Sequence, residues 1–125
     1  MSDPLDDWMT DYLRAWTSNR DGDIRSLFTD DAIYLTAPFD EPRVGVDAIV
    51  EGWLADRDDP SDWSFDWQPL VADGGLSTIT GETRYTDGRV YSNLWVIGLE
   101  ADGRASSFME WYMEHPTDDS RDPQI

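Results

Sequence analysis

The chain has 125 residues, so we expect one domain that is large enough for a hydrophobic core and a modest cavity. It carries 27 acidic and 9 basic residues and a net charge of −18, which disfavours binding to nucleic acid and to anionic membranes. The absence of cysteine excludes disulfides, thiol nucleophiles and thiolate metal sites.

The first half of the sequence predicts three helices around one strand. Residues 2–19 predict a helix that Asp3 caps and Pro4 begins, because its apolar residues recur at intervals of three and four. Three further elements are predicted before residue 60: a short helix over residues 24–28, a strand over residues 32–36, and a helix over residues 48–57 that Asp47 caps.

After residue 62 the pattern changes to alternating apolar and polar residues, which is the period of half-buried strands. Asp87-Gly88 and Asp102-Gly103 are strong signals for tight hairpin turns. Four strands are predicted, over residues 63–67, 76–85, 89–99 and 104–113. Helices followed by a run of antiparallel strands indicate an α+β fold in which one curved sheet carries the helices on one face and leaves a pocket between them.

No apolar run approaches the roughly 20 residues that a membrane span needs, and the N-terminal MSDPLDDW lacks the features of a signal peptide. We therefore expect a soluble, cytoplasmic protein with a single domain over residues 1–116 and a polar C-terminal tail over residues 117–125. The acidic composition has two explanations, a GC-rich or salt-adapted source or a cationic partner.

Four segments of the sequence, in order, resemble the SnoaL-like branch of the nuclear transport factor 2-like superfamily, which has a cystatin-like fold and includes the ketosteroid isomerases. They are GDIRSLFTDDAIYLTAP, PRVGVDAIVEGW, GETRYTDGRVYSNLWV and DGRASSFMEWYM, and the resemblance covers about residues 5–116. It implies a cone-shaped, curved antiparallel or mixed sheet with the N-terminal helices on its concave face. The superfamily includes isomerases, polyketide cyclases, epoxide hydrolases, dehydratases and non-catalytic binders, so the fold does not name the function.

The resemblance to the ketosteroid isomerases places Tyr12 on that family's oxyanion-stabilising tyrosine. It places Thr36 on the family's catalytic aspartate, and a threonine hydroxyl cannot accept a proton as a carboxylate does. The nearest residues to the family's second oxyanion donor are Asn93 and Trp95. The donors are therefore retained while the base is lost, which disfavours ketosteroid isomerase chemistry.

Glu110 is the strongest candidate for a replacement base. By strand alternation it shares a face with Phe108 and Tyr112, and an unpaired carboxylate on such a face is costly. Glu110 therefore either lines the pocket or pairs with an arginine as a structural element, and Arg84 is the first candidate for that partner.

Other polar residues keep two interpretations each. Arg84 belongs to a stripe that faces either the cavity or solvent, and Asn93 lies in either a wet pocket or an outer interface. Tyr12 is either an oxyanion donor or a core tyrosine. Asp40 and Glu41 are expected to be exposed, and the acidic segment DRDDPSD lacks the pattern of a calcium loop, so no metal site is predicted.

We expect an aromatic-lined pocket that binds a small, largely apolar organic ligand without a cofactor. One hypothesis is an enzyme that uses acid–base chemistry for isomerisation, cyclisation or hydration, and the alternatives are a non-catalytic binding protein and a protein-interaction module. A homodimer through the sheet is also expected, because alternating positions of the last strands carry large apolar residues. The expected catalytic residues are Glu110 and Tyr12, and the expected ligand-binding residues are Trp16, Tyr34, Trp53, Trp67, Arg84, Asn93, Trp95 and Tyr112.

Overall fold

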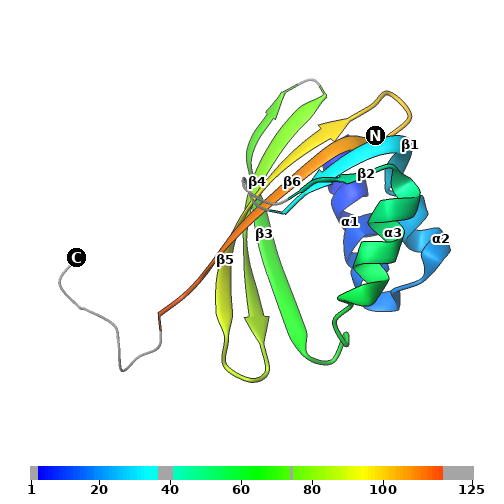
Figure 1. The fold of residues 1–125 in the computed structure, drawn as a ribbon. Helices are drawn as coiled ribbons and strands as arrows, with labels where there is room; N and C mark the ends of the chain where they lie inside the picture. The colour runs from blue at the N-terminus through cyan, green and yellow to red at the C-terminus, as the bar shows by residue number, and fades with distance from the viewer. Residues whose placement is uncertain (1–2, 37–40, 74, 117–125) are drawn as a thin grey trace.

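The computed structural model describes residues 3–36, 41–73 and 75–116. In this part of the chain three helices pack against one face of a six-stranded sheet (Figure 1). The helices are α1 (Pro4–Ser18), α2 (Asp21–Arg25) and α3 (Val46–Ala55). The strands are β1 (Phe28–Leu35), β2 (Arg43–Val44), β3 (Trp63–Asp73), β4 (Leu76–Tyr85), β5 (Val90–Leu99) and β6 (Ala105–Glu114).

The sheet has the strand order β2-β1-β6-β5-β4-β3. Neighbouring strands are antiparallel except for β1 and β6, which run parallel and bring the first strand beside the last. The sheet does not close on itself, and it curves around the helices, which lie on its concave side (Figure 1). The expected α+β cone is therefore confirmed.

Helix α1 begins and ends as its sequence predicts. The Asp3 carboxylate accepts a hydrogen bond from the Leu5 backbone N–H at 2.9 Å, and Pro4 occupies the first turn. The helix ends at Ser18 because Asn19 takes the left-handed conformation, with φ at 52°, and donates its backbone N–H to Ala15. Its buried face carries Leu5, Trp8, Met9, Tyr12 and Ala15.

Two helix boundaries differ from the prediction. Helix α2 covers residues 21–25 and not 24–28, because Phe28 pairs with Ala105 of β6 and is drawn into β1. Helix α3 begins two residues earlier than predicted, after Gly45, whose φ of 91° suits glycine. Asp47 therefore lies inside the first turn, where it binds Arg25 at 2.6 Å and does not act as the cap.

Three strand assignments also differ from the prediction. Strand β1 begins at Phe28 and not at residue 32. Strand β2 was missed because its two residues are too few to show a period. Strand β3 continues beyond Trp67 to Asp73 and includes Pro69, which a sheet tolerates here because β3 is an edge strand with one neighbour.

The cross-strand register decides which side chains face the helices. Ile79 lies opposite Trp95, Trp95 opposite Glu110, and Ile97 opposite Phe108, so these positions share the concave face. Trp95, Ile97, Ile79 and Phe108 are almost completely buried there, against the apolar face of α1. The alternate positions of the same strands face away from the helices, and they include Glu82 and Arg84.

The helices of the described region are all too short or too polar to cross a bilayer. Asp40 and the tail expected over residues 117–125 lie outside the described residues, whereas Glu41 is exposed as expected.

Candidate functional site

A cavity of about 330 Å³ opens between α1, α3 and the concave face of β4 to β6. Seven aromatic residues contribute to its lining: Tyr12, Trp16, Tyr34, Trp53, Tyr85, Tyr91 and Tyr112. Its polar lining consists of Thr36, Arg43, Asp56, Arg57, Asp58, Thr83, Asn93 and Glu110. The site is concave and combines aromatic walls with polar and charged groups that could orient a small molecule.

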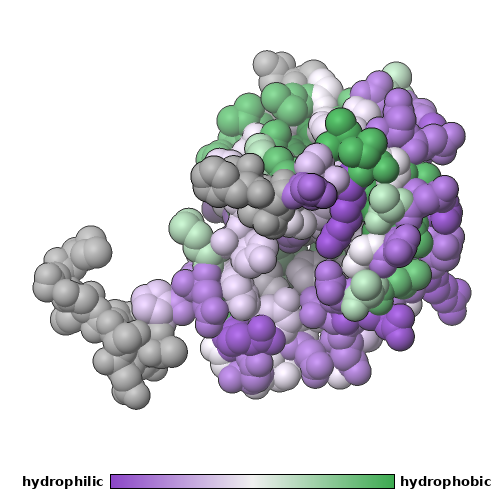
Figure 2. Space-filling model, in the orientation of Figure 1, coloured by the Kyte–Doolittle hydropathy of each residue, from purple (hydrophilic) through white to green (hydrophobic). Residues whose placement is uncertain are grey.

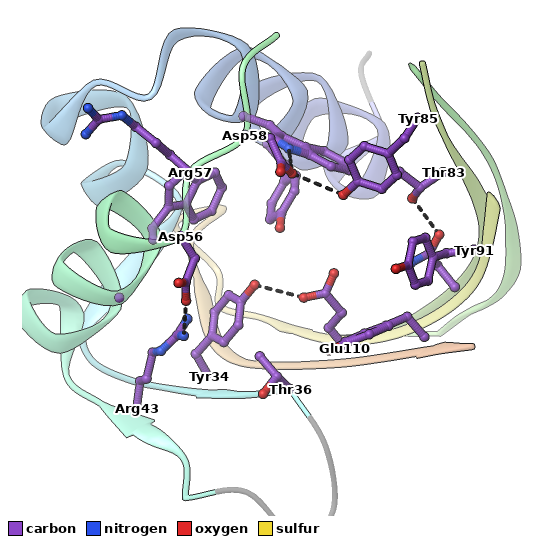
Figure 3. A pocket seen from close by; sticks show the side chains of 16 residues that line it. Tyr34, Thr36, Arg43, Asp56, Arg57, Asp58, Thr83, Tyr85, Tyr91 and Glu110 are labelled. Carbon is purple, nitrogen blue, oxygen red and sulfur yellow. Dashed lines mark hydrogen bonds and ion pairs between the residues drawn. The ribbon is translucent and has the colours of Figure 1, made fainter. Parts of the chain in front are cut away.

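Glu110 projects from β6 into this cavity, toward Tyr34 (Figure 3). The Tyr34 hydroxyl donates a hydrogen bond to its Oε1 atom at 3.1 Å. Burial raises the pKa of the Glu110 carboxyl above 4.5, whereas the Tyr34 hydrogen bond and the positive charge of Arg43 act in the opposite direction. Burial is the largest of these effects, so the net direction of the shift is upward.

The expected pairing of Glu110 with Arg84 is wrong. Arg84 forms an ion pair with Glu82 on the opposite face of the sheet. The register explains this position: Thr83 and Tyr85 line the cavity, so Arg84 between them points outward. Of the two interpretations of the Arg84 stripe, the solvent-facing one is confirmed.

Tyr12 and Tyr34 line the cavity together with Glu110. Burial, followed by the negative charge of Glu110, raises the pKa of both phenols well above 10.0. Both side chains therefore remain protonated and able to donate hydrogen bonds. Tyr12 belongs to both the cavity lining and the core. Its ring packs against the ring of Trp95, with 4.8 Å between the two centroids.

Asp58 lies across the cavity from Glu110, on the loop that follows α3 (Figure 3). Its Oδ2 atom accepts hydrogen bonds from the Trp16 indole and from the Tyr85 hydroxyl, both at 3.2 Å. Burial, followed by the charge of Asp58, raises the pKa of Tyr85. The carboxylate is thus held over the cavity by two aromatic side chains from different elements.

Asn19 fixes the loop that carries Asp58. Its amide nitrogen donates to the Asp58 backbone oxygen at 3.0 Å, and its amide oxygen accepts from the Trp53 indole at 3.0 Å. The residue that ends α1 therefore also ties the loop and α3 together at the cavity.

Arg43 occupies the side of the cavity near α3. It lies 3.5 Å from an Asp56 oxygen, and its guanidinium stands 5.4 Å from the centre of the Tyr34 ring. Gly52 makes this possible, because a Cβ atom at that position would overlap the guanidinium. The arginine is therefore held by α3 and Tyr34 rather than extended into the centre of the cavity.

Asn93 and Thr83 form the polar patch at the far end. Both side chains are buried, and the Thr83 hydroxyl donates to the Asn93 amide oxygen at 2.7 Å. The Asn93 amide N–H groups are left to donate to a ligand, since the described residues give them no hydrogen-bond acceptor. Of the two environments expected for Asn93, the structure shows the pocket.

Seven of the residues expected at the site line one cavity: Tyr12, Trp16, Tyr34, Trp53, Asn93, Glu110 and Tyr112. Three expected residues lie elsewhere. Trp95 is completely buried in the core beneath the cavity, Trp67 packs on the core from β3, and Arg84 is on the outer face.

Several cavity residues were not expected from the sequence, chiefly Asp58, Arg43 and Tyr85. DRDDPSD has the composition of a solvated loop, and nothing in its pattern indicates that Asp58 turns inward. Within the described part of the chain, no group of three or more carboxylate and histidine side chains is arranged to hold a metal ion.

A family model described as a SnoaL-like domain matches residues 9–117. A search of curated protein sequences finds no significant match. Many solved structures share the fold. One of them is an NTF-2-like protein of unknown function from Burkholderia xenovorans LB400. It matches with a TM-score of 0.70 and 15% sequence identity, and the match covers 98% of this chain and 95% of that chain.

Two further matches have named activities. One is a steroid delta-isomerase from Pseudomonas aeruginosa, with a TM-score of 0.64, 15% identity, and coverage of 94% of this chain and 83% of that chain. The other is an LEH-like epoxide hydrolase from M. tuberculosis, with a TM-score of 0.59, 15% identity, and coverage of 85% and 80%. At these identities the likeness establishes the fold alone.

Proposed function

The chain belongs to the SnoaL-like domain family, and on that premise we propose that its cavity binds a small, largely apolar organic molecule and that Glu110 exchanges a proton with it. The observation that carries this proposal is the position of Glu110, a carboxyl among aromatic side chains with a hydroxyl donor on one oxygen and no ion pair among the described residues.

The environment of Glu110 suits a general base. A carboxylate is a weak base at neutral pH, and burial that raises its pKa brings it closer to the working range. Its Tyr34 hydrogen bond orients the carboxyl without supplying a full positive charge that would hold it ionised. Glu110 therefore takes the role that Thr36 cannot fill, from a different strand.

The remaining polar groups suit the other half of such a reaction. When Glu110 removes a proton from a carbon next to a carbonyl group, the electron pair moves to the carbonyl oxygen. Tyr12 and the Asn93 amide are neutral donors that line the same cavity and can stabilise that oxygen. Return of the proton from Glu110 to another carbon completes an isomerisation. In a cyclisation, the carbanion attacks a second carbonyl group, and the oxygen of that group takes up the proton from Glu110.

The proposal is tested by proton exchange with simple ketones, because this step precedes any choice between isomerisation and cyclisation. In deuterated buffer, NMR should show that the protein accelerates exchange of the protons next to the carbonyl of 2-phenylcyclohexanone. Glu110→Gln should lower that acceleration by about 100-fold or more. Glu114→Gln, which removes an exposed glutamate of the same strand, is the matched control and should leave it unchanged.

Equal exchange rates for the parent and Glu110→Gln would remove Glu110 from the chemistry. If the parent causes no exchange but binds the ketone with quenching of its tryptophan fluorescence, the proton-exchange proposal fails and the non-catalytic binding alternative is supported. Trp16 and Trp53 line the cavity and serve as the fluorescent reporters.

A further inference from the structure

Two carboxylates face the same cavity from opposite sides without an arginine on either. Glu110 extends from the sheet, and Asp58 extends from the loop after α3 (Figure 3). The ion pairs within the described residues include neither of them. Their hydrogen bonds come from neutral groups, namely the hydroxyls of Tyr34 and Tyr85 and the indole of Trp16.

The two carboxylates also act on each other and on the tyrosine between them. The negative charge of Asp58 raises the pKa of Glu110, and both charges raise the pKa of Tyr12 after the larger effect of burial. The space between them is therefore flanked by two carboxylates, and the positive charge of Arg43 at the side of the cavity offsets them in part.

The two arginines near the cavity are engaged elsewhere. Arg43 is held at the side by Asp56 and by the Tyr34 ring. Arg57 points away from the cavity, and its guanidinium lies 3.5 Å from the Leu54 backbone oxygen (Figure 3). Neither provides a fixed cation in the centre, so a carboxylate or phosphate group of a ligand there would lie between two carboxylates.

From this arrangement we infer that the natural ligand of the cavity is an organic cation, an apolar molecule with one ammonium group that lies between Asp58 and Glu110. This inference deepens the proposed function and rests on it. The ammonium would neutralise the two carboxylates, while its apolar body would contact the aromatic walls.

The rest of the cavity and the molecule favour the same ligand. The faces of aromatic rings attract cations, and seven aromatic residues line the cavity. The net charge of −18 concentrates organic cations near the surface and repels anions before they reach the cavity. The neutral donor Asn93 at the far end can meet a carbonyl or hydroxyl oxygen on the same ligand.

The test compares three probes that share a phenyl ring and a short side chain: 2-phenylethylammonium, 2-phenylethanol and phenylacetate. Binding is measured by calorimetry and tryptophan quenching at pH 7 and about 0.15 M salt, where surface charges are largely screened. We expect the cation to bind at least about tenfold more tightly than the alcohol, and phenylacetate to bind more weakly than the alcohol.

Asp58→Asn tests the effect of a charge inside the cavity separately from the effect of the general surface charge. The asparagine removes the charge but keeps an oxygen that can accept hydrogen bonds from Trp16 and Tyr85. We expect it to lower the preference for the cation over the alcohol by about fivefold or more, with little change in the affinity for the alcohol. Asp62→Asn is the matched control, since it makes the same charge change on the same loop outside the cavity lining.

The inference is overturned if the alcohol binds as tightly as the cation, or if Asp62→Asn lowers the cation preference as much as Asp58→Asn. In those cases binding in the cavity still stands, and so does the proposed function. If none of the probes binds, the binding role of the cavity fails and the inference fails with it. The probe series on the parent protein decides the question even if Asp58→Asn does not fold.

Discussion

The protonation of Glu110 connects the stability of the protein to its proposed chemistry. Burial favours the neutral form of this carboxyl, and Tyr34 and Arg43 favour the charged form less strongly, so that its pKa is raised overall. The folded chain then keeps a proton at pH values where the unfolded chain has lost it. The contribution of Glu110 to stability is therefore complete below about pH 4.5 and is lost as the pH rises through the folded pKa.

Glu110→Gln should remove this pH dependence, since glutamine does not titrate. We expect the variant to match the parent in melting temperature near pH 4, to exceed it increasingly as the pH rises through the folded pKa of Glu110, and to keep a constant advantage above that pKa. Each tenfold increase in the proton affinity of the folded carboxyl corresponds to about 1.4 kcal/mol of unfolding free energy. A difference between the two proteins that is constant with pH would contradict the assignment, and Glu114→Gln again controls for the loss of one negative charge.

At the scale of the elements, the floor of the cavity depends on how closely β3 and β4 pack. Gly81 of β4 lies under the Phe65 ring, which stacks on Trp95 with centroids 4.9 Å apart. A Cβ atom at Gly81 would come within 2.8 Å of a Phe65 ring carbon and 3.1 Å of the Asp66 backbone oxygen. The glycine therefore allows the aromatic side chain of one strand to cover the backbone of the next.

Gly81→Ala should destabilise the fold by about 1–3 kcal/mol, because Phe65 cannot move away without disturbing Trp95. Gly22→Ala is the matched change with the opposite expectation. Residue 22 lies in α2, and a Cβ atom there would meet nothing within 4 Å. We therefore expect the unfolding free energy to increase by about 0.5–1 kcal/mol. Urea unfolding measures both, and a stabilised Gly81→Ala variant would show that the strands have room to separate.

At the scale of the whole molecule, the convex face of the sheet carries exposed apolar residues over β1, β2 and β6. Trp111, Met113, Ile33 and Val44 alternate with concave-face residues and keep exposed fractions of 43%, 73%, 46% and 63%. Figure 2 shows hydrophobic residues in the upper part of the molecule and hydrophilic residues along its lower and right-hand edges. Exposed apolar surface of this kind is typical of an interface.

We propose that the convex face forms a homodimer. Sedimentation at moderate salt should give the mass of two chains, and Trp111→Glu should give the mass of one because a carboxylate in the interface is desolvated without a partner. Thr10→Glu on the exposed side of α1 adds the same charge and should remain dimeric. A parent protein that sediments as a single chain at moderate salt contradicts this prediction; low salt is avoided because repulsion between two chains of −18 would weaken a real dimer.

The local elements could be predicted because their causes are local. The apolar stripe and the Asp3 cap specify α1, and the Asp-Gly pairs place the hairpin turns. The resemblance to the SnoaL-like branch then implied the cone, and strand alternation placed Glu110 on the same face as Phe108 and Tyr112. Seven of the residues expected at the site accordingly line the cavity.

What the sequence alone could not decide is which face of β4 meets the helices and which loops turn inward. Alternation is symmetric between the two faces, so it left two interpretations of the Arg84 stripe open. The register with β5 and the packing on α1 place Arg84 on the outer face. Asp58 enters the cavity because Asn19, 39 residues earlier in the chain, holds its backbone there. A contact between residues so far apart in the chain leaves no periodic trace in the sequence, so only the tertiary structure brings Asp58 opposite Glu110.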